Sequence, residues 1–120
     1  MNRIIINNIK RLIDNHQTDE TKSYIIQTIQ NINDLEYHIN QLDIFKQAFN
    51  HACIRGNRDL ISWFLEAYLT YFNDIEKIAI RQLFFYGKYL IINEKRHQIR
   101  DKEDLLHWYE EKIIPKIKIN

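Results

Sequence analysis

Glycine, proline and cysteine are scarce in this chain of 120 residues, which has two glycines, one proline and one cysteine. Hairpins and sandwiches of β-strands depend on glycine and proline at their turns, so the scarcity argues against a β-rich fold. Long helices joined by short polar turns are the expected alternative. Because 45% of the residues are apolar, the chain can bury one core without a disulfide or a metal ion.

The single cysteine, Cys53, excludes an intramolecular disulfide and favours a reducing compartment, so we expect a cytoplasmic location. Its apolar neighbours predict a buried, inert thiol. The apolar run Ile4 to Ile6 is interrupted at Asn7 and Asn8, well before the length of a signal-peptide core or a membrane span. We therefore expect neither secretion nor membrane insertion.

A strong excess of one charge is also missing, since the net charge is only +1. This value argues against nucleic-acid binding through bulk positive charge. The stretch from Lys77 to Lys102 is nevertheless basic, with seven basic and two acidic residues. With Tyr86, Tyr89 and His97 nearby to stack on bases, it supplies candidate contacts for nucleic acid or a partner: Lys88, Lys95, Arg96, Arg100 and Lys102. A solubilising loop beside an acidic last helix is the alternative interpretation.

Apolar residues recur at helical spacing along most of the chain. In the first part we expect a helix over about residues 3–14. A second helix, capped by Thr18 or Asp19, ends in the polar pair at 33–34. The segment 35–42 carries a weaker helical pattern.

The middle of the chain predicts the best-defined helix hairpin. Asp43 is a suitable N-cap for its first helix, and Gly56 is placed to end that helix with a positive φ. Asn57 then caps the second helix after a very short turn. The apolar stripes of the two helices face each other, so we expect burial of Ala52, Cys53, Leu60, Ile61, Phe64 and Leu65.

A long helix follows from Asn73 or Asp74. Beyond Leu83 this helix is apolar on nearly every side, which indicates burial between neighbours or cover by a partner; we expect burial within the domain. The stretch 93–100 is predicted to be a loop, and the last helix begins at Asp101 or Asp104 and stops at Pro115.

We therefore predict an all-α fold of five or six helices in antiparallel hairpins. A single helical domain spans residues 1–114, and a frayed tail spans residues 115–120.

The residues from Ala52 to Glu66, Ala-Cys-Ile-Arg-Gly-Asn-Arg-Asp-Leu-Ile-Ser-Trp-Phe-Leu-Glu, resemble the middle of an ankyrin repeat. That family has a small residue, a glycine turn, a polar cap and an acidic residue before pairs of large apolar residues. Residues 47–50 depart from it, because only the large apolar residue of the family's Thr-Pro-Leu-His is kept. The repeat is most similar to those of large DNA viruses, including the multigene-family proteins of African swine fever virus. The resemblance implies an ankyrin-like pair at the centre of the fold and an intracellular viral protein that binds host or viral proteins.

Catalytic and metal-binding patterns are missing. The five histidines are scattered, and the spacing of His51 and Cys53 places their side chains on different sides of a helix. The acidic pairs at 103–104 and 110–111 fall on an expected solvent face, and no glycine-rich phosphate loop is present. We therefore expect no catalytic residue, metal site or cofactor.

The favoured function is a non-enzymatic protein–protein interaction module. The alternative is a small accessory protein that contacts nucleic acid through the loop at 88–102. The expected partner is a protein, with self-association left open.

Overall fold

The structure is a computed structural model that describes residues 2–30, 38–95, 97 and 99–118. These residues form six long helices and a short one, with no strand among them, so the all-α prediction is confirmed. The helices are α1 (Asn2–Asp14), α2 (Thr18–Gln30), α3 (His38–Arg55), α4 (Arg58–Tyr71), α5 (Asp74–Asn93), α6 (Ile99–Lys112) and α7 (Ile114–Lys118).

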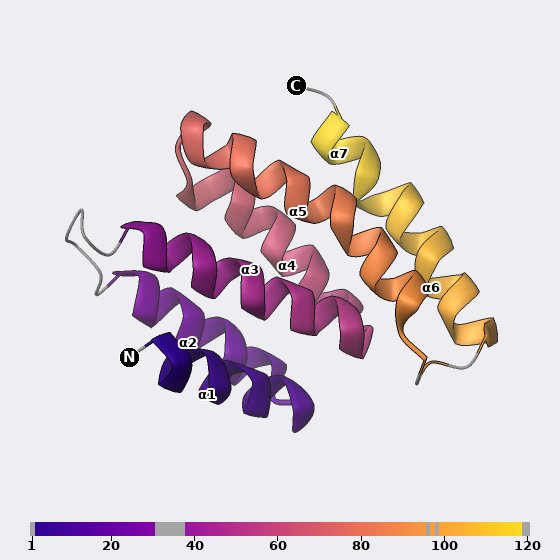
Figure 1. Ribbon diagram of the computed structural model, residues 1–120, viewed down its shortest axis with the longest axis horizontal. Helices are drawn as coiled ribbons and strands as arrows, with labels where there is room; N and C mark the ends of the chain where they lie inside the picture. Colours follow the sequence, from indigo (N-terminus) through magenta and orange to yellow (C-terminus); the bar gives the residue numbers. More distant parts are fainter. Residues whose placement is uncertain (1, 31–37, 96, 98, 119–120) are drawn as a thin grey trace.

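Three pairs of consecutive helices, α1 with α2, α3 with α4 and α5 with α6, pack as antiparallel hairpins (Figure 1). The first helices of the three hairpins, α1, α3 and α5, run in the same direction, and α3 packs between the other two. The helices α2 and α4 return in the opposite direction behind this layer. On the far side of α5, α6 and α7 complete the packing.

The core is centred on α3 and α4. Phe64 of α4 makes edge-to-face ring contacts with Phe45 and Phe49 of α3, and Phe49 also contacts Phe84 of α5. Such ring pairs add about 0.5–1.5 kcal/mol to the burial of their apolar area. The burial expected for the hairpin is confirmed for Ala52, Cys53, Leu60, Ile61, Phe64 and Leu65.

The turn between α3 and α4 has the geometry predicted at Gly56, whose φ is +70°. The Gly56 amide donates to the Cys53 carbonyl and the Asn57 amide to the Ala52 carbonyl, both at 3.1 Å. This pair of bonds is the Schellman arrangement, which satisfies the last carbonyls of a helix. Asn57 is the N-cap of α4, since its Oδ1 accepts from the Leu60 amide.

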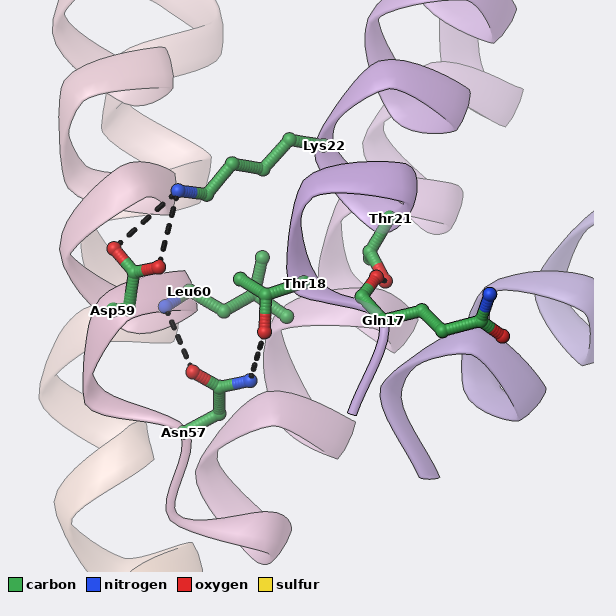
Figure 2. Close-up of polar contacts among 7 residues, drawn as sticks. All are labelled: Gln17, Thr18, Thr21, Lys22, Asn57, Asp59 and Leu60. Carbon is green, nitrogen blue, oxygen red and sulfur yellow. Dashed lines mark hydrogen bonds and ion pairs between the residues drawn. The ribbon is translucent and has the colours of Figure 1, made fainter. Parts of the chain in front are cut away.

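The Asn57 side chain also joins α4 to α2 (Figure 2). Its Nδ2 donates to the Thr18 hydroxyl at 3.1 Å. Because α2 begins at Thr18, both Thr18 and Asp19 lie inside the helix, and the prediction that one of them is its N-cap was wrong. Gln17 occupies the cap position instead, where its carbonyl accepts from the amide and the hydroxyl of Thr21.

The turn between α1 and α2 repeats this geometry without a glycine. His16 has a φ of +59°, its amide donates to the Ile13 carbonyl, and the Gln17 amide donates to the Leu12 carbonyl. A side chain in this left-handed conformation is strained, which is why glycine is favoured there. The histidine is exposed, and its strain arises from the close approach of Cβ to its own backbone.

Two predicted helix boundaries are wrong. Asp43 caps no helix, because α3 begins at His38 and no glycine or proline interrupts it. The last long helix starts at Ile99, before the predicted Asp101 or Asp104. The predicted end of the second helix at 33–34, and residues 35–37 of the weak segment 35–42, lie outside the described residues, whereas residues 38–42 form the start of α3.

The tail is also more ordered than predicted. Pro115 lies in the first turn of α7, where a proline costs no hydrogen bond because the amides of that turn have no partner within the helix. Ile117 of this short helix is buried, and α7 packs against α5 and α6. The expectation of a frayed tail from residue 115 is thus wrong as far as Lys118, where the described residues end.

Helix α5 starts with a capping box, in which Asn73 and Glu76 each accept the other's backbone N–H. Near its other end, Gly87 lets α5 approach both α3 and α6. A Cβ at this position would lie 2.6 Å from the Tyr109 hydroxyl and 3.1 Å from the Phe49 ring. These contacts hold α5 tightly on one side and set which of its side chains face outward.

Candidate functional site

One side of α5 carries large apolar side chains that the rest of the molecule leaves uncovered. The exposed fractions are 81% for Ile75, 65% for Ile78, 55% for Tyr86 and 56% for Tyr89. With Gln82 between them, these residues recur every three or four positions and fall within an arc of about 80° on the helix. We call these five residues the α5 stripe.

Exposure of the α5 stripe corrects the expectation that this helix is buried within the domain. The buried side of α5 is formed by Glu76, Ile80, Phe84, Gly87 and Ile91. The sequence pattern could not separate the two sides, because both carry large apolar residues. The only sequence signal for an exposed apolar side was the excess of apolar residues around the helix. That excess was also compatible with cover by a partner instead of burial within the domain.

The α5 stripe carries no charge of its own. Charged residues flank it along one side, with Asp74 at the start of the helix, Lys77 and Arg81 beside Ile78, and Lys88 towards the end. The Lys88 ammonium lies 2.8 Å from Oε1 of Glu110 on α6. This hydrogen bond raises the pKa of Lys88 and lowers that of Glu110, so both groups stay charged at neutral pH.

Self-contacts occupy part of the predicted basic set. Besides the pairing of Lys88 with Glu110, the Lys102 ammonium donates to the Ile92 carbonyl at 3.0 Å and ties α6 to the end of α5. Lys95 is exposed in the loop between these helices, and Arg100 is exposed in α6. Arg96 lies outside the described residues. The four described positions are thus spread over two helices and a loop.

The aromatic residues expected beside that loop are also separated. His97 covers the turn between α3 and α4, because a Cβ on Gly56 would lie 3.2 Å from the imidazole Cε1. It is half-buried there. Tyr86 and Tyr89 contact each other, with ring centroids 6.5 Å apart, and belong to the α5 stripe. Among the described side chains, one pocket lined by Lys88, Tyr89 and Lys118 brings basic and stacking residues together, and His97 lies outside it.

Apart from the α5 stripe, a pocket of about 420 Å³ lies between α4 and α6. Trp63 and Trp108 form part of its lining, and the Arg58 guanidinium lies 5.6 Å from the Trp108 ring centroid. Both tryptophans are half-buried. At the rim, Lys22 of α2 forms an ion pair with Asp59 (Figure 2). Lysine and carboxylate side chains thus share the rim, which favours no particular charge in a ligand.

The residues capable of covalent or metal chemistry are not assembled into a site. Cys53 is buried, and this burial raises the pKa of its thiol far above the usual range, so no thiolate forms at neutral pH. Among the described residues, no three histidine, cysteine or acidic side chains come together to hold a metal ion. The same residues include no helix long and apolar enough to cross a membrane.

Comparisons with protein families, curated proteins and solved structures find no match to this chain. The ankyrin-like resemblance of residues 52–66 therefore stays a prediction. Function has to be inferred from the surface of this chain. The α5 stripe is the part of the described surface where four large apolar side chains are exposed on one helix.

Proposed function

We propose that this chain is a non-enzymatic protein-interaction module and that the α5 stripe is its contact surface. The observation that carries the proposal is the exposure of two isoleucines and two tyrosines on one side of a helix that is firmly packed on its other side. A rigid aromatic surface of this kind binds a partner with little loss of conformational entropy. Tyrosine is also enriched among the residues that contribute most to protein interfaces.

The packing of the hairpins supports the same function. In stacked helical repeats, corresponding helices of successive hairpins lie side by side and form an extended binding surface. Here α1, α3 and α5 lie in this way, and the α5 stripe belongs to the last helix of the layer. Together with the resemblance of residues 52–66, this arrangement favours a cytoplasmic protein that binds host or viral proteins.

Nucleic-acid binding has less support. Of the five basic residues on which it depends, Lys88 and Lys102 make contacts within the chain. His97, which was expected to stack on bases, packs on a turn instead. If phosphate contacts nevertheless dominated, binding would be strong at low salt and would weaken steeply at physiological salt. A gel shift with single- and double-stranded nucleic acid tests this alternative directly.

Affinity capture from the native cell, read by mass spectrometry, tests the proposed function. We would compare the unaltered chain with Ile78→Ser, which alters the α5 stripe, and with Ile4→Ser. Ile4 lies on α1 and is exposed to the same 65% as Ile78, so it is a matched control.

We expect proteins captured by the unaltered chain to be retained by Ile4→Ser and depleted with Ile78→Ser. Equal capture by both variants would show that the α5 stripe is not the contact surface. A gel shift that is strong at low salt and weakens steeply towards physiological salt, with no specific protein captured, would instead favour nucleic-acid binding.

A further inference from the structure

The α5 stripe is symmetric about its own middle. Gln82 lies four residues from Ile78 and from Tyr86, and seven residues from Ile75 and from Tyr89. A two-fold axis through Gln82, perpendicular to the helix, would therefore place each isoleucine of one copy opposite a tyrosine of an antiparallel second copy. Large and flat side chains would alternate along the contact, with no position left empty.

The charges at the two ends of the contact favour the antiparallel direction over the parallel one. An antiparallel pair brings Asp74 of one copy within about one helical turn of Lys88 of the second copy, whose ammonium Asp74 would share with Glu110. A parallel pair would instead place Asp74 beside Asp74 and Lys88 beside Lys88. Antiparallel packing also sets the N-terminal end of each helix dipole beside the C-terminal end of the other.

The area available sets the expected strength. Each tyrosine of the stripe exposes more than half of its surface, which corresponds to roughly 100 Å² per side chain. The four large side chains then offer roughly 400–500 Å² per copy, below the ~800 Å² typical of a stable interface. A weak, reversible dimer is the expected result, because an interface of this size falls at the low end of specific contacts.

We infer that a second copy of this chain is an occupant of the α5 stripe, packed antiparallel about a two-fold axis at Gln82. The inference rests on the proposed function, because it names one partner for the same surface. It commits to a definite register, in which residue 78 of one copy contacts residue 86 of the second copy. Residue 82 of one copy contacts residue 82 of the second copy.

Sedimentation equilibrium of the full chain tests for the dimer. Over about 5–500 µM, the average mass should rise from the monomer value of 14.7 kDa towards twice that value. Ile78→Glu should raise the dissociation constant at least tenfold, because it places a charge in an uncharged contact. Ile4→Glu makes the same change at an equally exposed isoleucine and should leave the dissociation constant unchanged. Circular dichroism confirms that both variants fold.

Disulfide trapping tests the register. Under mild oxidation Gln82→Cys should form a covalent dimer, because the two copies of this position face each other. Ile78→Cys alone and Tyr86→Cys alone should not, since each would meet its own copy about 12 Å away along the helix, beyond the reach of a disulfide. An equal mixture of the latter two should form the mixed dimer. Cys53 is buried and does not interfere.

The outcomes separate this inference from the proposed function. A chain that remains monomeric up to about 500 µM and gives no Gln82→Cys dimer overturns the inference, while capture that depends on Ile78 would still support an interaction module. Trapping of Ile78→Cys with itself would show a parallel pair and overturn the antiparallel register. Dimerisation that is equally strong in Ile78→Glu would place the contact on another surface.

Discussion

Replacing Gly87 by alanine distinguishes the intrinsic preference of a helix from the packing around this one. Gly87 lies inside α5, where alanine is intrinsically favoured over glycine by about 1 kcal/mol. Helix propensity alone therefore predicts a more stable protein. The structure predicts the opposite sign, because the added methyl group has no space.

The magnitude follows from the contacts that the methyl group would make. It would lie 2.6 Å from the Tyr109 hydroxyl and 3.1 Å from two carbons of the Phe49 ring. Tyr109 is buried, and its hydroxyl donates to the Phe84 carbonyl, so the ring cannot move without breaking this bond. If the ring stays in place, overpacking costs up to about 3 kcal/mol, and if it moves, the unsatisfied hydroxyl costs a similar amount. After subtraction of the helix preference of about 1 kcal/mol, we expect a net loss of about 2 kcal/mol.

Urea unfolding followed by circular dichroism measures this loss, and Tm should fall by roughly 8 °C. Tyr109→Phe removes the oxygen atom that the methyl group would meet. In that background, Gly87→Ala should cost at least about 1 kcal/mol less than in the unaltered chain. A Gly87→Ala protein that is more stable than the original would refute the close approach of α5 and α6.

Four further predictions can be checked by the same unfolding measurements. Phe64→Ala should cost about 3–5 kcal/mol, because it leaves a cavity beneath three aromatic rings; an unchanged Tm would show that this face is not core. Gly56→Ala should cost about 1 kcal/mol or more, because it places a side chain at a positive φ. His16→Gly should stabilise the protein by up to about 1 kcal/mol, because it removes a side chain from the same conformation. Effects of the reverse sign would contradict the left-handed geometry of these two turns. Desolvation raises the pKa of Asp14, but the hydrogen bonds from His51 and Arg55 outweigh it, so the net pKa is lowered. Asp14→Asn should therefore lose under about 1 kcal/mol at neutral pH, and the difference from the original should disappear as the pH falls below about 4, through the lowered pKa of Asp14.

Much of the local structure can be predicted from the sequence. Periodic apolar residues and a lack of glycine and proline predicted an all-α chain, and the Gly56-Asn57 pair predicted the turn between α3 and α4. These features depend on interactions within a few residues, which the order of the amino acids determines directly. The same reasoning missed His16, because a histidine in a left-handed turn has no distinctive sequence signal.

The candidate site could not be predicted, because it depends on which side of α5 the other helices cover. Ile78 and Ile80 are equally apolar and only two residues apart, yet one is exposed and the other buried. Only tertiary packing separates them: Gly87 lets α5 approach Phe49 and Tyr109 on one side, and the opposite side is left to solvent. The sequence alone determined that the chain is helical and where the turn between α3 and α4 lies. The assembled fold decided which apolar residues remain available to a partner, since burial is a property of contacts between distant segments.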